Sequence, residues 1–254
     1  MMSKQRGATL IVVLFLLLAI IVLGTLAVRQ SLVSLNIATN SQAQQLLIQN
    51  SDSAFFNVER VDNIIQSLSS SGMFGYISGA TDKDKELVFC YRGSEASFFD
   101  ISRASIIYWK PGGTAPTNNE FGTEGYCDAS EQATNFFTSG RRAVMTQVAV
   151  KFSSISENDP FFGAQFGTDD QAVKFDRSKP VKVFAVSVMP TLTNADSADI
   201  NTCFRNHMSE VTIPEGTSVA LNAVSRQTVT ECLSELNVPF TSHVTEYVIV
   251  QDFV

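Results

Sequence analysis

The chain has 254 residues, of which 44% are hydrophobic and 17% charged, and 18 basic against 25 acidic residues give a formal net charge of -7. This composition supplies enough apolar residues for one substantial core. Because the chain is acidic, its composition argues against a protein that binds nucleic acid directly.

The first predicted element is an apolar helix behind a short basic head. Residues 8–28 contain no charge and no proline, and as a helix they extend about 31 Å, the thickness of one bilayer core. Lys4 and Arg6 precede them, so the positive-inside rule predicts a cytoplasmic N-terminus and an extracytoplasmic chain from Arg29 onward. We therefore expect a single pass through the inner membrane.

Three interpretations of this stretch remain open. A cleaved secretory signal, with Thr25-Leu26-Ala27 near its cleavage site, would release a soluble protein. A plain signal anchor would keep the helix and leave the rest of the chain tethered. The third interpretation starts from Gly7, which ends the basic head, and from a helical pattern that continues beyond the membrane.

Residues from Gln30 to Ser71 include no proline or glycine and favour a helix. Apolar residues recur there on one helical stripe: Leu47, Ala54, Val58, Val61, Ile65 and Leu68. We expect one helix from Ala8 to Ser71 that buries this stripe on a partner surface. Residues 30–45 are mostly polar and are expected to be solvated or to contact other helices. Gly72 should then end the helix in a left-handed conformation.

The remaining residues predict a head of strands, short helices and two long loops. Strands are expected at 86–91, 104–110, 143–152, 181–189 and 243–253. The loops at 111–126 and 155–180 are candidate interaction surfaces. A short helix is expected at 130–138, and another at 229–236 behind a capping box of Thr228 and Glu231. The fold class is α+β, with a long helix against an antiparallel sheet.

Four cysteines, Cys90, Cys127, Cys203 and Cys232, follow the membrane stretch. An even number of cysteines in an oxidising compartment predicts two disulfides, and no spacing among them suggests zinc. Of the three connectivities, we favour Cys90 with Cys127 and Cys203 with Cys232, because each pair closes a local loop within one subregion.

The N-terminal residues resemble those of type IV pilins. The leader MMSKQRG is similar to the short basic leader that prepilin peptidase cuts, and the cut would fall between Gly7 and Ala8. The run QRGATLIVVLFLLLAIIVLG resembles the start of PilX-type minor pilins. This resemblance implies a pilin-like α+β fold with a leader (1–7), a transmembrane half-helix (8–28), an extracytoplasmic half-helix (29–72) and a disulfide-bonded head (73–254).

Val12 departs from the usual pilin pattern, which places a glutamate at this fifth mature position. In the family, the partner of that glutamate is taken to be the N-terminal amine of the preceding subunit. A carboxylate at the bilayer centre costs about 2.5 to 3.5 kcal/mol on insertion scales. A subunit without it resembles one that has no predecessor, at or near the pilus tip.

The resemblance implies a minor pilin that helps to prime assembly of a type IV pilus and sits in its tip complex. The implied partners are other minor pilins, the major pilin, prepilin peptidase, the inner-membrane assembly platform and a large tip adhesin. The assembled pilus would serve adhesion, twitching motility and DNA uptake. Two alternatives remain open: a tip pseudopilin of a type II secretion system, and a membrane-anchored periplasmic enzyme or binding protein.

Catalytic and metal-binding motifs are absent from the sequence. His207 and His243 are the only histidines, and no HExxH, GxSxG or phosphate-binding loop occurs. Acidic clusters at 82–86 and 194–201 offer oxygen atoms for calcium, but neither matches an EF-hand loop and solvated turns are preferred. We expect no enzyme, no cofactor and no metal.

Phenylalanine is abundant, with 19 residues, and most should lie in the core. Phe161, Phe162 and Phe166 belong to a glycine-containing loop and are the preferred partner contacts, with burial of that loop as the alternative.

Overall fold

The computed structural model describes residues 8–78, 82, 84–118, 120–130, 137–138, 142–152 and 179–249. The chain divides into two compact units, Met1–Gln45 and Leu46–Val254. The first helix, α1 (Ala8–Glu59), begins in the first unit and ends in the second.

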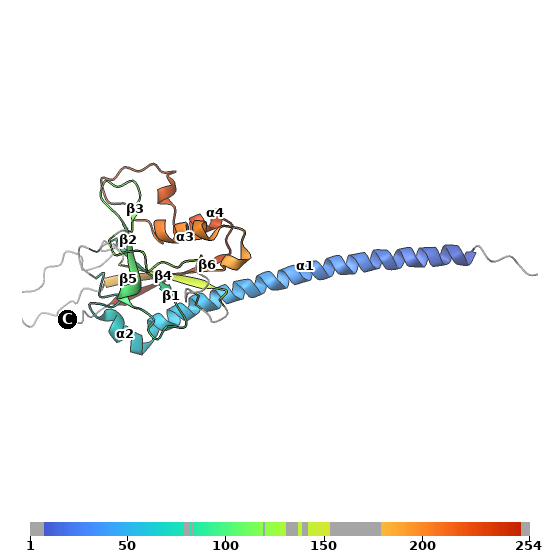
Figure 1. The fold of residues 1–254 in the computed structure, drawn as a ribbon, viewed down its shortest axis with the longest axis horizontal. Coiled ribbons are helices and arrows are strands. Elements are labelled where there is room, and N and C mark those ends of the chain that lie inside the picture. Colours follow the sequence, from blue (N-terminus) through green and yellow to red (C-terminus); the bar gives the residue numbers. More distant parts are fainter. Residues whose placement is uncertain are drawn as a thin grey trace, which may run out of the picture. The chain divides into compact units, whose positions relative to one another are not determined.

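The second unit is built on a six-stranded antiparallel sheet (Figure 1). Its strands are β1 (Glu86–Tyr91), β2 (Ala104–Trp109), β3 (Pro116–Thr117), β4 (Met145–Phe152), β5 (Lys179–Val188) and β6 (Phe240–Ile249), in the spatial order β3-β2-β1-β4-β5-β6. Its helices besides the end of α1 are α2 (Val61–Leu68), α3 (Ser197–Asn206) and α4 (Val229–Glu235). All five expected strands are present, β3 is additional, and the long helix with an antiparallel sheet makes the fold α+β.

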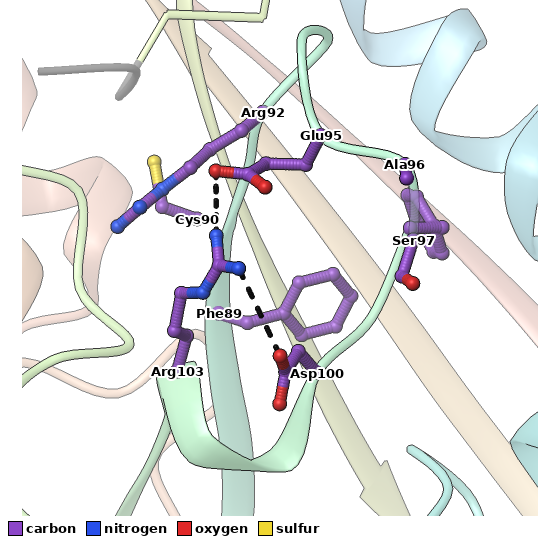
Figure 2. A pocket seen from close by; sticks show the side chains of 9 residues that line it. Phe89, Cys90, Arg92, Glu95, Ala96, Ser97, Asp100 and Arg103 are labelled. Carbon is purple, nitrogen blue, oxygen red and sulfur yellow. Dashed lines mark ion pairs between the residues drawn. The ribbon is translucent and has the colours of Figure 1, made fainter.

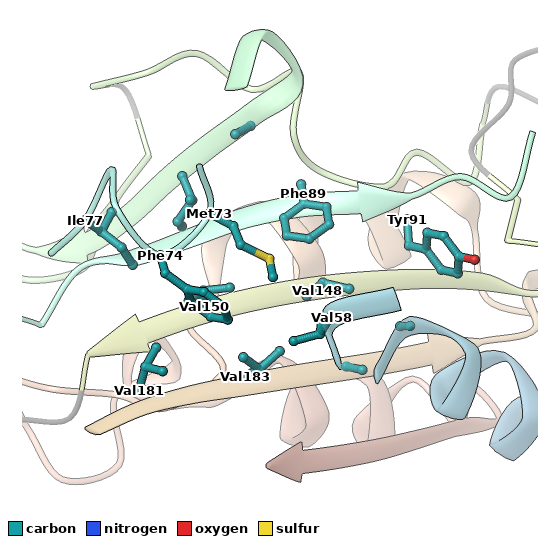
Figure 3. Close-up of a cluster of buried hydrophobic side chains, with 14 of the residues drawn as sticks. Val58, Met73, Phe74, Ile77, Phe89, Tyr91, Val148, Val150, Val181 and Val183 are labelled. Carbon is teal, nitrogen blue, oxygen red and sulfur yellow. The ribbon is translucent and has the colours of Figure 1, made fainter. Parts of the chain in front are cut away.

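Side chains alternate between the two faces of the sheet along each strand, and in β1, β2 and β4 they are mostly buried on both faces. One face packs against Ala54 and Val58 of α1 and the turn that follows α2 (Figure 3). The sheet side chains on that face are mainly valine and aromatic: Leu87, Phe89, Tyr91, Val148, Val150, Val181 and Val183. The other face packs against α3 and α4 through Ile200, Phe204 and Leu233. Figure 1 shows these helices on the side of the sheet opposite α2.

The expected single helix to Ser71 is wrong, because the chain breaks at Arg60. Arg60 has an extended backbone (φ -62°, ψ 129°), so α1 ends at Glu59 and a new helix, α2, begins at Val61. The stripe therefore divides: Leu47, Ala54 and Val58 are buried, whereas Val61 and Ile65 are 75% and 73% exposed.

Gly72 does not take the left-handed conformation that the sequence suggested. Among the described residues, the glycines with positive φ are Gly112, Gly122 and Gly216. Gly72 is needed for a close approach instead, because a Cβ there would lie 2.2 Å from the carbonyl oxygen of Gln66.

The last third holds one confirmed helix and one that the sequence did not predict. The capping box of Thr228 and Glu231 is present at the start of α4. The polar run at 194–201, expected as a loop, instead enters α3, whose Ile200, Cys203 and Phe204 face the core. Most of the helix expected at 130–138 lies outside the described residues.

Both disulfides have the favoured pairing. Cys90 is bonded to Cys127, which ties β1 to the segment after the first loop, and Cys203 is bonded to Cys232, which joins α3 to α4. No cysteine is free.

Candidate membrane helix and interaction surfaces

The first unit exposes a continuous apolar helical surface. Every large apolar side chain from Leu10 to Val28 is exposed, and exposure continues at Leu32, Val33, Leu35 and Ile37. By length and composition, α1 could cross a membrane. A helix that is apolar all round must be buried in protein or in lipid, so this surface requires an apolar environment.

Two residues that the sequence analysis singled out, Ala8 and Val12, lie at the start of this helix. Ala8 is the first residue of α1. Val12 is 57% exposed on the apolar surface. Gly7 lies outside the described residues, as do the three predicted contacts Phe161, Phe162 and Phe166.

In the second unit, polar contacts join the last turns of α1 to the sheet. Asn57 donates a hydrogen bond to the Tyr91 hydroxyl at 2.9 Å, and the same hydroxyl lies 3.2 Å from the Ser53 hydroxyl. The Tyr247 hydroxyl donates to Glu59 at 3.0 Å. These hydrogen bonds are directional and therefore favour one rotation of the last turns of α1 on the sheet.

An apolar stripe on α2 faces away from the core. Val61, Ile64 and Ile65 are exposed, and Phe56 at the end of α1 is 67% exposed, whereas Ser67 on the opposite side of α2 is buried. The start of this helix thus presents apolar side chains outward, whereas Leu68 at its end is partly buried and packs on the core. The sequence pattern revealed the stripe but not the break at Arg60 that turns it outward.

A buried charged pair lies on the sheet face opposite α1. Glu86 and Lys151 are opposite each other on β1 and β4 and are 0% and 1% exposed. Glu86 accepts hydrogen bonds from the backbone N–H groups of Ser209 and Glu210, both at 2.8 Å. Lys151 donates to the carbonyl oxygen of Glu210 at 2.8 Å and to the hydroxyl of Thr212.

Burial is the largest cause of the pKa shifts of Glu86 and Lys151. Burial raises the pKa of Glu86, although Lys151 and the two N–H groups oppose the shift. Burial likewise lowers the pKa of Lys151, against the opposing charges of Glu86 and Glu210. The pair holds the backbone of Ser209 and Glu210 and the hydroxyl of Thr212 on the sheet, and the oxygen atoms of Glu86 accept hydrogen bonds rather than being available to calcium.

Asn201 of the second acidic cluster also has structural partners. Asn201 of α3 is buried, accepts a hydrogen bond from the N–H of Ala129 at 2.7 Å and donates to Asp128 at 2.6 Å. Burial opposes ionisation of Asp128, but hydrogen bonds from Ser130 and Asn201 and the charge of Arg205 lower its pKa overall. In the part of the chain that the structure describes, no group of three acidic, histidine or cysteine residues could hold a metal ion.

The connection between β1 and β2 encloses a pocket of about 140 Å³ (Figure 2). Its wall includes Phe89 and Cys90, whose sulfur belongs to a disulfide. Arg103 pairs with Glu95 at 2.6 Å and with Asp100 at 3.8 Å, as the dashed lines show. The residues that line the pocket include no histidine, lysine or free thiol.

Comparison with known proteins identified no relative: no family model, no curated protein and no solved structure matches this chain.

Proposed function

We propose that this chain is a minor pilin of the PilX type. It is processed between Gly7 and Ala8, held in the inner membrane by residues 8–28 with its N-terminus in the cytoplasm, and built into the tip complex of a type IV pilus. Its fold is pilin-like and its action is non-covalent. Other minor pilins, the major pilin, the assembly platform and a tip adhesin are its partners.

One observation carries this proposal: α1 is a single unbroken helix from Ala8 to Glu59. Its beginning is apolar and exposed, and its end lies in the core of a disulfide-bonded α+β unit. A signal peptide or a plain anchor needs no such continuity, because its helix can stop at the membrane surface. A subunit that assembles through its membrane helix does need it, since the helix must stay fixed to the head.

The exposed apolar surface of α1 would drive the assembly of the subunit into the pilus. Residues 8–28 leave lipid only if helices of neighbouring subunits bury them again, and such helix contacts form by close packing rather than by apolar transfer. Val12 adds no charge that needs a partner in an earlier subunit, which supports a place at or near the tip.

The N-terminal peptide mass of the protein from native membranes and from sheared surface pili tests this proposal. We expect a chain that starts at Ala8, with one added methyl group, in both fractions. A chain that starts at Val28, or one with an intact leader, would overturn the proposal. A processed chain that is absent from pili would favour the pseudopilin of a secretion system.

The tip position predicts the effect of a carboxylate at position 12. Val12→Glu should reduce recovery in sheared pili, because an unpaired carboxylate costs about 2.5 to 3.5 kcal/mol in an apolar helix environment. Val12→Leu is the matched control and should leave recovery unchanged. Equal recovery of the two variants would contradict the tip position.

A further inference from the structure

The two edges of the sheet differ in how far they are protected. At one edge, β3 has two residues and begins with a proline. The turn beside it is held by a later segment: Gly112 N–H donates to the Thr217 hydroxyl at 3.0 Å, and the Ser225 hydroxyl donates to the Thr114 carbonyl oxygen at 2.8 Å. At the other edge, β6 is ten residues long and pairs only with β5 among the described strands.

Within the described residues, the β6 edge shows none of the sequence features or bulges that usually protect an edge strand. Its sequence, FTSHVTEYVI, contains no proline, lysine or arginine, and its register with β5 continues over ten residue pairs without a bulge. Proteins usually protect such edges with short strands, prolines, lysines or bulges, because an open edge pairs with other chains. β3 follows this rule and β6 does not.

The exposed side chains of β6 indicate which residue types an added strand would carry. On the face opposite α1, Val244 and Val248 are 54% and 58% exposed and flank Glu246. Glu246 ends a row of charged residues that crosses four strands, Glu86, Lys151, Lys182 and Glu246, in which Glu246 lies opposite Lys182. Because opposite charges across neighbouring strands are favourable, a lysine or arginine suits the next position outward.

On the other face of β6, α1 places two carboxylates beside the strand. Asp52 lies 3.3 Å from His243, Glu59 accepts the Tyr247 hydroxyl, and both carboxylates belong to exposed residues of α1. A second copy of this chain would bring an equally acidic edge against this one. Like charges therefore disfavour a symmetric pair, and a basic segment of another protein suits the edge.

We infer that the outer edge of β6 binds an extended segment of a partner protein, which adds a seventh strand to the sheet. The segment places apolar residues beside Val244 and Val248 and a basic residue beside Glu246. Backbone hydrogen bonds provide affinity, and the alternating side chains provide selectivity. This inference goes beyond the proposed function and depends only on the second unit of the chain.

Amide hydrogen exchange of the full chain in detergent tests the inference directly. The probes are two synthetic heptapeptides with blocked ends, Thr-Val-Thr-Lys-Thr-Val-Thr and the same peptide with glutamate in place of lysine. We expect the β6 N–H groups that point away from β5 to exchange freely in the chain alone. The lysine peptide should slow their exchange about tenfold or more, and the glutamate peptide should have much less effect.

Charge-reversal variants provide the matched control. Glu246→Lys should reverse the preference, so that the glutamate peptide protects the edge better. Glu215→Lys changes the net charge by the same amount as Glu246→Lys, but in an exposed turn. With this variant, the lysine peptide should still protect the edge better than the glutamate peptide.

Three results would overturn the inference. Outward amides that are already protected without peptide would mean that the chain covers its own edge. Protection that rises with protein concentration would mean that a second copy binds there. Equal or absent protection by the two peptides would mean that the edge does not select a basic strand.

Discussion

The last turns of α1 and the start of α2 are neighbours in the sequence, but apolar residues of one stripe have opposite environments in them. Ala54 and Val58 are almost fully buried against the sheet, and Val61 and Ile65, which follow on the same sequence stripe, are exposed. The difference arises at one extended residue, Arg60. An amphipathic pattern therefore shows that a helix has an apolar side, whereas the chain direction decides whether that side meets the core.

The largest expected effect contrasts a charge at these two positions. Val58→Asp buries an unpaired carboxylate in the core and should lower the free energy of unfolding by about 3 kcal/mol or more. Ile65→Asp, on the exposed stripe, should change it by less than about 0.5 kcal/mol. Urea unfolding of the full chain in detergent, followed by fluorescence of the single, buried Trp109, measures both. Similar losses would mean that α2 is also packed inward.

A smaller loss is expected from Tyr91→Phe. The Tyr91 hydroxyl contacts Ser53 and Asn57 of α1, and its removal should cost about 1 to 2 kcal/mol because two partly buried polar groups lose their partner. Tyr76→Phe is the control, since Tyr76 is 37% exposed and its ring packs beside Phe121. The same unfolding measurement applies, and an unchanged midpoint for Tyr91→Phe would show that apolar packing alone fixes α1.

A gain in stability is expected from a cap at the break between the helices. Arg60 is the N-cap residue of α2 but makes no side-chain cap hydrogen bond. Arg60→Ser supplies such a bond and should raise the unfolding free energy by about 0.5 to 1 kcal/mol. Arg60→Ala removes the charge without adding a cap. It therefore separates the effect of the new cap hydrogen bond from the effect of losing the arginine side chain. A gain for both variants would assign the effect to the arginine side chain instead.

The smallest effect concerns pH and the end of α1. Burial, together with the hydrogen bond to Glu59, raises the pKa of Tyr247 above its ordinary value. The folded chain keeps this proton while the unfolded chain releases it from about pH 10 upward, so stability should fall as pH rises through that range. Tyr247→Phe should weaken this fall, measured as the change in urea midpoint between about pH 8 and about pH 10.5. An identical fall in the variant would assign the pH dependence to other groups.

Much of the head follows from local sequence patterns. β-branched and aromatic runs identified five strands, and the capping box of Thr228 located α4 within one residue of its end. The disulfide pairing followed from short loops. These features depend on neighbouring residues, which a single sequence displays directly.

Features that depend on distant residues could not be predicted in this way. Glu86 belongs to an acidic run in the sequence, and only the fold places Lys151 opposite it. Arg60 breaks the helix without a glycine, a proline or a capping side chain to mark it. For α3 a signal was available: Ile200, Cys203 and Phe204 have helical spacing within a polar run that suggested a loop.

The order of the disulfides along the chain has a consequence for folding during synthesis. Each bond joins consecutive cysteines, separated by 37 and 29 residues. A chain that emerges from its N-terminus presents the first pair before the third cysteine appears, and domains begin to fold as they emerge. Oxidation in order of appearance would therefore yield the native pairs without any exchange between disulfides.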